Sequence, residues 1–400
     1  MQNFVQKIMK IDLGYKINNK FDLIIWWSIV TLLGILIFST AVGQALLILL
    51  ILLGLFKIIK EEKAFSIKRP IVLPFVVFIG IRVLSIIFSE YPSLSVYSLN
   101  KEIFFYLIVF VFLTELSKYD EEKIRFLIRI LIIAAIIASI IGTAKVLLGN
   151  VERATSTTSG YSTLGMFLSV IFSIVFTLGR NKEFFPSRTW WLVILFLLLS
   201  GILFTFNRSN WITIVIIIFI IGLFKERIIL GVLLIIFALM IFLIPNLSER
   251  FNEIIHFPQH LSDRDVIWQG ALMISDQHFI LGFGTRTFKE IFPLYQQLVD
   301  KEVGGWHNEY LQVYMESGIL GLLAFLWLMF SIYYWGIKTL KHSATEKFKF
   351  DLKLAVLAGL SIFYLNSLSG GFLLDPISKV LFFFLLAMAS NLIGSQNKTT

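Results

Sequence analysis

The 400-residue sequence contains no cysteine, which excludes disulfide bonds, thiolate chemistry and cysteine-bound metal. Charged residues are scarce, at 15% of the chain, whereas an average soluble domain has about 25%. The first twenty residues lack the short apolar core and small-residue cleavage site of a signal peptide, so we interpret them as a cytoplasmic lead. We also find no internal repeat between the two halves of the chain.

Apolar residues take the place of charge, at 57% of the chain, with a mean hydropathy of +0.84. A soluble domain is only about 45–50% apolar and could not bury this excess, so lipid must be the solvent. Each crossing of a membrane uses roughly 20 residues, and the length therefore predicts one helical bundle. The apolar runs are continuous instead of alternating, which excludes the strands of a membrane barrel.

These runs predict an all-α integral membrane protein with about twelve transmembrane helices and one large helical loop between helices 9 and 10. The predicted domains are a bundle of about nine helices (1–244), the polar loop with short helices (245–316) and about three further helices (317–400). The predicted crossings are 21–39, 42–59, 71–89, 101–116, 124–148, 162–179, 190–206, 210–224, 228–244, 317–338, 353–370 and 377–393.

Lysine and arginine are distributed unevenly between the two sides of this topology. With the N-terminus inside, one side carries 23 of them, and the short loops of the other side carry only Lys101, Arg153, Arg208 and Lys379. The positive-inside rule then places both termini in the cytoplasm and the polar segment 245–316 outside. The same bias accounts for most of the net charge of +9, so no nucleic acid is needed as a partner.

The polar segment shows helical signals, and long loops are usually functional. Ser262 and Asp265 form a capping-box pattern before DVIWQGALMIS. Ile267, Trp268, Ala271 and Leu272 mark an apolar face there. The two glycines of GFG, at positions 282 and 284, are expected to end this helix, and a second is expected to start near Trp306 and enter the crossing at 317.

Cations on the outer side are few, and three of them are candidate anion ligands. Arg208, in FNRSNW, could otherwise anchor to lipid headgroups. Arg264, in SDRDVIW, could otherwise pair with Asp263 or Asp265. Arg286, in GFGTRTF, follows a glycine turn whose backbone could approach an anion, although such a turn is a weak signal alone.

His307, in GGWHNEYLQVYMESG, is the most informative of the five histidines. The start of a helix disfavours the imidazolium, which would keep the ring neutral and able to accept a proton. The alternative is a ring that merely packs beside Trp306. His256, His260, His278 and His342 lack comparable neighbours and are read as surface residues.

Arg82 lies inside the third predicted crossing, in GIRVLS. An ionisable residue within a membrane is expensive and is a functional candidate by default. Its alternatives are a side chain that reaches one interface and an ion pair with a carboxylate such as Glu90.

Taken together, the segments from about 200 to 325 resemble the O-antigen ligase family, which shares its conserved region with the O-antigen polymerases. FNRSNW, SDRDVIW, LGFGTRTF, WHNEYL and ESGILGLLAFL follow in that order. Each piece is weak alone, but the order and spacing are fairly specific. The N-terminal half matches only in hydropathy.

The resemblance implies a glycosyltransferase that moves a glycan from undecaprenyl pyrophosphate to the lipid A–core oligosaccharide, at the periplasmic face of the bacterial inner membrane. It implies an inverting, metal-independent reaction without a cofactor, in which Arg208, Arg264 and His307 are essential. Its partners are the lipid-linked donor, the lipid A–core acceptor and membrane lipid.

Physical chemistry agrees with these roles. A pyrophosphate leaving group needs cations as its bond breaks, and the planar fork of arginine holds phosphate oxygens bidentately. The loop has no Asp-x-Asp metal motif. Substrate contacts are expected from Arg208, Arg264, Arg286 and Arg82. Supporting contacts are expected from Asn308, Glu309, Tyr310 and Glu316.

Three alternatives to a ligase remain open at this point. A polymerase uses the same donor but extends another carrier-linked glycan, and a related enzyme could glycosylate protein. A polytopic transporter is less favoured, because transporters usually show repeats and polar residues near the midplane, whereas this chain gathers its polar groups in one loop.

Overall fold

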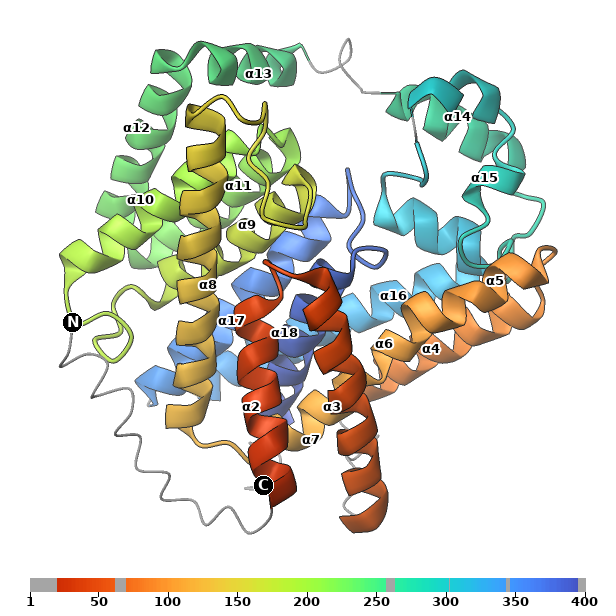
Figure 1. Cartoon of the computed structure of the whole chain (residues 1–400), viewed down its shortest axis with the longest axis horizontal. Coiled ribbons are helices and arrows are strands. Elements are labelled where there is room, and N and C mark those ends of the chain that lie inside the picture. Colours follow the sequence, from red (N-terminus) through yellow and green to blue (C-terminus); the bar gives the residue numbers. More distant parts are fainter. Residues whose placement is uncertain (1–19, 62–69, 257–262, 302, 343–345, 395–400) are drawn as a thin grey trace.

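The protein is described by a computed structural model that covers residues 20–61, 70–256, 263–301, 303–342 and 346–394 (Figure 1). These residues form helices and contain no strand, so the prediction of an all-α protein is confirmed. The helices are α2 (Lys20–Ile35), α3 (Thr40–Glu61), α4 (Val72–Ile87), α5 (Pro92–Ser98), η1 (Leu99–Ile103), α6 (Phe104–Tyr106), α7 (Ile108–Leu116), α8 (Glu121–Leu147), α9 (Tyr161–Leu178), α10 (Arg188–Phe204), α11 (Arg208–Lys225), α12 (Arg227–Leu243), α13 (Pro245–Ile255), α14 (Arg264–Ile274), α15 (Phe288–Ile291), η3 (Tyr295–Gln297), η4 (Val299–Lys301), α16 (Glu309–His342), α17 (Lys347–Asn366) and α18 (Pro376–Gly394).

Each predicted crossing contains a helix. Within the described residues, seven helices are long and apolar enough to cross a membrane. The pair α12 and α13, bent by 107°, is an eighth candidate, and α4 and α10 are apolar but shorter. The chain is therefore a multi-pass helical membrane protein, while the number of twelve crossings remains a prediction.

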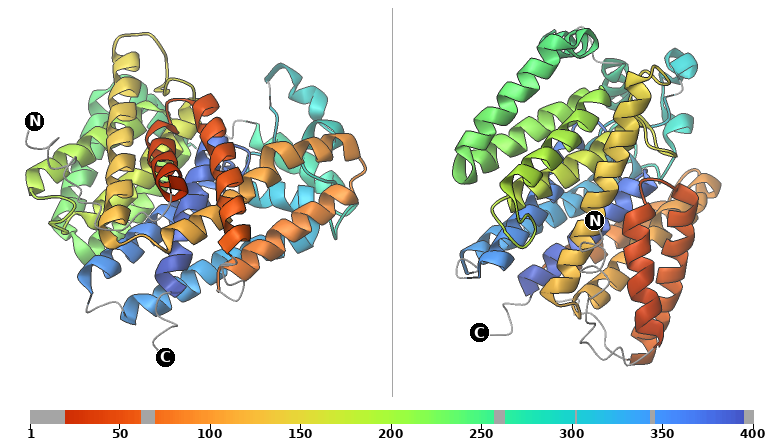
Figure 2. Two further views of the ribbon diagram at one scale, coloured as in Figure 1. Left: turned by 60° about the horizontal axis from the view of Figure 1, so that its bottom comes forward. Right: turned by 60° about the vertical axis from the view of Figure 1, so that its left-hand side comes forward.

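The C-terminal helices share one hydrophobic core with the N-terminal ones. The helix α17 packs against α9, α18 packs against α7, and α16 runs beside α4 (Figures 1 and 2). Most residues of α9 and α18 are buried, whereas α12 exposes large apolar side chains such as Phe242, at 82%. In a membrane protein such an exposed face meets lipid. The segments before and after the polar loop are thus parts of one bundle.

The structure pairs segments that the predicted topology places on the same side of the membrane. At one end of the bundle, Lys225 Nζ lies 2.5 Å from Asp351 Oδ1, and both residues belong to the predicted inner side. At the other end, Ser89 Oγ donates to the carbonyl of Phe283 at 2.7 Å, and both are predicted outside. The contacts define two faces, and the assignment of one face to the periplasm remains a prediction.

The segment from α14 to the first turns of α16 folds around a second, smaller apolar cluster. From α14, Ile267, Ala271 and Ile274 are buried, at the i, i+4, i+7 spacing of one helix face. The predicted face was partly wrong, because Trp268 and Leu272 point outward, with 38% and 76% of their surface exposed. The cluster also includes Phe283, Phe288, Phe292, Leu298, Trp306 and Met315.

The start and end of α14 differ from the prediction. Its N-cap is Asp263, which has a left-handed backbone (φ 60°) and makes no side-chain cap bond. Ser262, the predicted cap, and His260 lie outside the described residues. The helix ends at Ile274, before the glycines that were expected to end it.

The prediction that a helix starts near Trp306 and continues into the apolar segment at 317 is confirmed by α16, which is broken at Gly318 (φ 65°, ψ −168°). Backbone groups freed by a break within a membrane need partners in the protein. Phe283 N donates to Met315 O at 2.9 Å, and Ile319 N donates to Phe279 O at 2.8 Å. The segment after α14 therefore docks on the break, backbone to backbone.

Two glycines make this close approach feasible. A Cβ on Gly282 would lie 2.5 Å from backbone atoms of Glu316 and Ser317, and a Cβ on Gly318 would lie 2.2 Å from the Ile280 carbonyl oxygen. Both glycines also have positive φ, which other L residues rarely adopt. The GFG turn is thus a packing element of the break and not a helix end.

Candidate functional site

Arg208 is the first residue of α11. Asn207 caps the helix, because its Oδ1 accepts from Ser209 N at 3.2 Å. The Nη1 atom of Arg208 lies 3.1 Å from Glu253 Oε2 on α13. The arginine is therefore held at the N-terminal end of its helix by a partner from the polar segment.

Arg264 is the first residue of α14, and its Nη2 donates to the carbonyl of Ser369 at 2.7 Å. Ser369 lies in the loop between α17 and α18. Asp263, one of the predicted alternative partners, forms an ion pair with Lys301. The guanidinium thus links the polar segment to the C-terminal helices.

His307 lies two residues before the start of α16 and is exposed, as a group that meets a substrate must be. Trp306 turns inward, with its ring edge-on to Phe288 at 4.8 Å between centroids. Asn308 begins the helix, because its Oδ1 accepts from Leu311 N at 3.0 Å. The arrangement separates the tryptophan, which packs, from the histidine, which faces outward.

Electrostatics connect these three residues. Burial, followed by the nearby charge of Arg208, lowers the pKa of Arg264 below its usual value. Partial shielding of the His307 ring by surrounding protein, followed by the charge of Arg264, lowers the pKa of His307. The structure therefore brings Arg208, Arg264 and His307 into one electrostatic neighbourhood, in which the imidazole favours its neutral form.

Residues with a strained backbone lie in four of the sequence motifs described above. Four non-glycine residues have positive φ in the part of the chain that the structure describes: Phe206, Asp263, Arg286 and His307. They lie in FNRSNW, SDRDVIW, GFGTRTF and WHNEYL. Such conformations cost about 1–3 kcal/mol each and cluster at functional sites.

Arg286 and Arg82 belong to a second group, which is joined by Glu316. Glu316 Oε1 accepts from Arg286 N at 2.9 Å, and its Oε2 lies 2.8 Å from Arg82 Nη2. Arg82 is fully buried and also pairs with Glu102. Glu316 thus supports a cation, as expected, and holds the left-handed backbone of Arg286.

The predicted ion pair of Arg82 with a carboxylate is present, but its partner is not Glu90. Arg82 pairs with carboxylates, but Glu90 instead lies 3.0 Å from His278 Nε2. The His278 ring also lies 4.5 Å from that of Phe283. His278 therefore has neighbours that the sequence did not reveal.

The loop 367–373 contacts several candidate site residues, which the sequence analysis did not predict. Asn308 Nδ2 donates to Leu368 O at 3.1 Å, and Glu309 Oε2 accepts from Leu373 N at 3.0 Å. The same loop supplies the carbonyl that accepts from the guanidinium of α14. The start of α16 and the start of α14 are thereby tied to one loop. No local pattern in SLSGGFL indicates this role.

Further basic residues also surround Arg208. Arg153 and Arg250 both lie within electrostatic range of it. The guanidinium of Arg153 stacks 4.5 Å from the ring of Tyr161, which is within range of Arg264. The sequence analysis counted Arg153 among the cations of the predicted outer loops but did not propose it as a site residue. The signal that could have identified it is that lysine and arginine are rare in those loops.

The remaining supporting residue, Tyr310, donates its hydroxyl to the Tyr364 carbonyl at 3.0 Å and so attaches α16 to α17. Across the described ranges, no three His, Asp or Glu side chains come together as metal ligands would. His256 bonds its own helix, with Nδ1 3.0 Å from Asn252 O.

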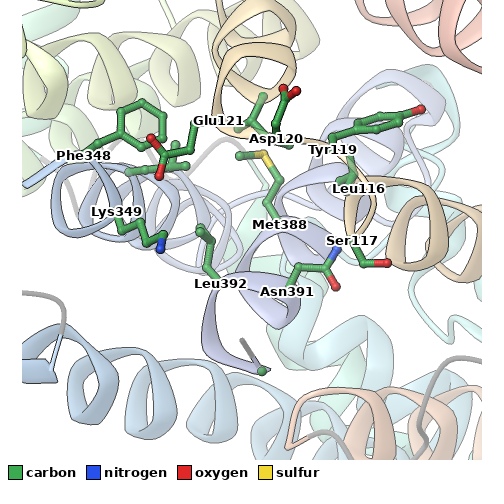
Figure 3. A pocket seen from close by; sticks show the side chains of 13 residues that line it. Leu116, Ser117, Tyr119, Asp120, Glu121, Phe348, Lys349, Met388, Asn391 and Leu392 are labelled. Atoms are coloured by element: carbon green, nitrogen blue, oxygen red, sulfur yellow. The ribbon is translucent and has the colours of Figure 1, made fainter. Parts of the chain in front are cut away.

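A cavity of about 370 Å³ lies elsewhere in the bundle (Figure 3). It lies between the ends of α7, α8, α17 and α18 and includes Tyr119, Asp120, Lys349 and Asn391 in its lining. None of the predicted site residues lines it. This cavity is therefore separate from the basic neighbourhood.

Residues 193–326 match the O-antigen ligase family. The matched region contains Arg208, Arg264, Arg286 and His307, and it agrees with the resemblance seen in the sequence. A comparison with curated proteins finds no match.

Proposed function

We propose that the chain, which carries an O-antigen ligase region, is a membrane glycosyltransferase of lipopolysaccharide synthesis. It would transfer a glycan from undecaprenyl pyrophosphate to the lipid A–core oligosaccharide on the periplasmic face of the inner membrane. The observation that carries the proposal is the meeting of Arg208, Arg264 and His307 in one neighbourhood.

In the proposed reaction, a hydroxyl oxygen of the acceptor attacks the anomeric carbon of the donor glycan. The bond from that carbon to the phosphate oxygen breaks, and undecaprenyl pyrophosphate leaves with the electron pair. Arg208 and Arg264 stabilise the charge that develops on the pyrophosphate. Neutral His307 accepts the hydroxyl proton and later releases it to water. A single displacement of this kind inverts the anomeric configuration.

Arg264 and His307 fit these tasks electrostatically. Two arginines held near each other repel, and an anion placed between them relieves that repulsion. A cation next to a histidine keeps the imidazole neutral, which a proton acceptor requires. The same charges would therefore bind the leaving group and prepare the base.

Arg82 and Arg286 would act less directly. Arg82 is fully buried between Glu102 and Glu316, so we assign it to holding α4 against α16 and not to substrate contact. Arg286 is half-buried beside the α16 break and remains a candidate ligand for the donor.

The family match does not distinguish a ligase from an O-antigen polymerase. Deletion of the protein in its native host, followed by gel analysis of lipopolysaccharide, separates the two. A ligase predicts loss of all glycan-capped lipopolysaccharide, with polymer accumulating on the lipid carrier. Caps of a single repeat would instead identify a polymerase, and unchanged lipopolysaccharide would contradict both.

A further inference from the structure

Glu253 connects two arginines through a single oxygen atom. Its Oε2 lies 3.1 Å from Nη1 of Arg208 and 2.6 Å from Nη1 of Arg250. Two guanidinium groups thus converge on one point, and a carboxylate oxygen occupies it. Arginine forks of this kind are suited to the oxygens of phosphate as well as carboxylate.

The carboxylate is presented by α13, which follows the 107° bend after α12. Leu247 of α13 is fully buried, while the side chains of Arg250 and Glu253 on the same helix are 28% and 27% exposed. The helix is therefore anchored by its apolar face, and its charged face remains within reach of a ligand.

We propose that Arg208 and Arg250 form a second phosphate subsite, in which Glu253 is the resident anion that a diphosphate displaces. The proposal rests on the proposed function and deepens it, because it assigns Arg250 and Glu253, which lie outside the predicted site, to recognition of the diphosphate. Arg264 would then hold one phosphate group of the donor while Arg208 and Arg250 hold the other.

The exchange is favourable for electrostatic reasons. A carboxylate brings one negative charge to the two arginines, whereas a diphosphate brings two or more. The displaced Glu253 side chain is partly exposed and can rotate into water, where its charge is solvated. No bond is made or broken in this step. In the absence of donor, Glu253 keeps the two arginines in position.

Pyrophosphate binding to the full-length protein in lipid nanodiscs tests the exchange, with calorimetry as the readout. Glu253→Gln removes the competing charge and should tighten the binding of inorganic pyrophosphate by about tenfold, since relief of about 1.4 kcal/mol of competition corresponds to a factor of ten in affinity. Glu249→Gln is the matched control, because Glu249 is an exposed carboxylate on the same helix. It should leave the affinity unchanged. Glu253→Ala should act like Glu253→Gln, and Arg250→Gln should weaken binding.

The outcomes separate this inference from the proposed function. If Glu253→Gln and Glu249→Gln bind pyrophosphate alike while Arg208→Lys weakens binding, the second subsite is wrong and the arginine site stands. If neither the wild type nor Glu253→Gln binds pyrophosphate, both proposals are overturned. Repeating the titration with undecaprenyl pyrophosphate identifies the source: tightening with the lipid assigns the subsite to the donor, and tightening with inorganic pyrophosphate alone assigns it to the free anion.

Discussion

At the scale of single residues, the arginines of this chain differ in how deeply they are buried and in whether they pair with carboxylates. Arg82 is fully buried and paired with two carboxylates, so its removal would leave uncompensated charge and cost roughly 3–5 kcal/mol of stability. Arg208 and Arg264 are half-buried and repel each other. Substitutions at these two positions should therefore reduce the rate of transfer more than the amount of folded protein.

Arg264→Lys tests the role of the guanidinium fork. Lysine keeps the charge but loses bidentate geometry, so we expect a fall in the rate of glycan transfer of about 100- to 1,000-fold, close to that of Arg264→Ala. The measurement is transfer by the purified protein, normalised to the amount inserted. A fully active lysine variant would show that Arg264 acts only as a point charge. Lys301→Arg, in the same polar segment, is the control and should leave the rate unchanged.

His307 is expected to act through its neutral ring. His307→Ala should be inserted normally and lose about 100- to 10,000-fold in rate, as for removal of a general base. His307→Gln still forms a hydrogen bond but accepts no proton at neutral pH. If glutamine restores most of the activity, the ring only orients the acceptor hydroxyl, and the proposed base catalysis is wrong.

The pH profile supplies an independent check on His307. Shielding of the ring by surrounding protein, followed by the charge of Arg264, lowers the pKa of His307, so the ring stays neutral as the pH falls through the usual histidine value of about 6.5. Activity should consequently be constant near neutral pH and fall only below about pH 6.5. The acid limb of kcat/KM reports this value for the free enzyme. An acid limb above the usual histidine value would contradict a lowered pKa.

At the scale of elements, continuous apolar runs predicted the positions of the helices well. The run 162–179 corresponds to α9 (Tyr161–Leu178) and the run 71–89 to α4 (Val72–Ile87). An apolar membrane environment favours such helices almost regardless of their neighbours, because every backbone group must bond within its own segment. Local sequence therefore suffices for them.

Elements shaped by distant contacts were not predictable in this way. The crossing expected at 101–116 is preceded by α5 (Pro92–Ser98), a polar segment. Ser95 Oγ donates to the Thr285 carbonyl at 3.3 Å, across 190 residues of chain. The break at Gly318 likewise depends on the GFG turn, and hydropathy carries no record of such pairings.

Gly282→Ala tests whether the GFG turn supports the break in α16. The added Cβ would meet backbone atoms of Glu316 and Ser317 at 2.5 Å, and the left-handed backbone alone costs about 1–2 kcal/mol. We expect a lower yield of folded protein and loss of transfer activity. Gly80→Ala is the matched control, because a Cβ there meets nothing within 4 Å. Equal behaviour of the two variants would show that the docking is dispensable.

At the scale of the whole molecule, charge distribution predicts which face of the bundle is periplasmic. The absence of cysteine makes single-cysteine labelling clean. Gln277→Cys, on the exposed surface of the polar segment, should react with an impermeant thiol reagent in spheroplasts, where the outer face of the inner membrane is accessible. Lys182→Cys, exposed on the opposite face, should react only after permeabilisation. The reverse pattern would invert the topology and place the proposed site in the cytoplasm.

The sequence singled out three residues that the structure brings near one another, but not the residues around them. Arg208, Arg264 and His307 stood out because cations and histidines are rare on the outer side of so apolar a chain. Arg250 and Glu253 were hidden in a polar stretch, where charge is ordinary. The loop 367–373 takes part through its backbone, which side-chain patterns do not describe. Only the folded bundle brings these segments together.

The most direct test of the account is transfer by the purified protein in the presence of EDTA, with a carrier-linked glycan as donor and lipid A–core as acceptor. If Arg208 and Arg264 carry the pyrophosphate charge and His307 takes the proton, the wild type should form the glycan-capped product at an undiminished rate without divalent ions. The variants His307→Ala and Arg264→Lys should not form it appreciably. A strict requirement for added magnesium or manganese, or full activity in both variants, would contradict this account.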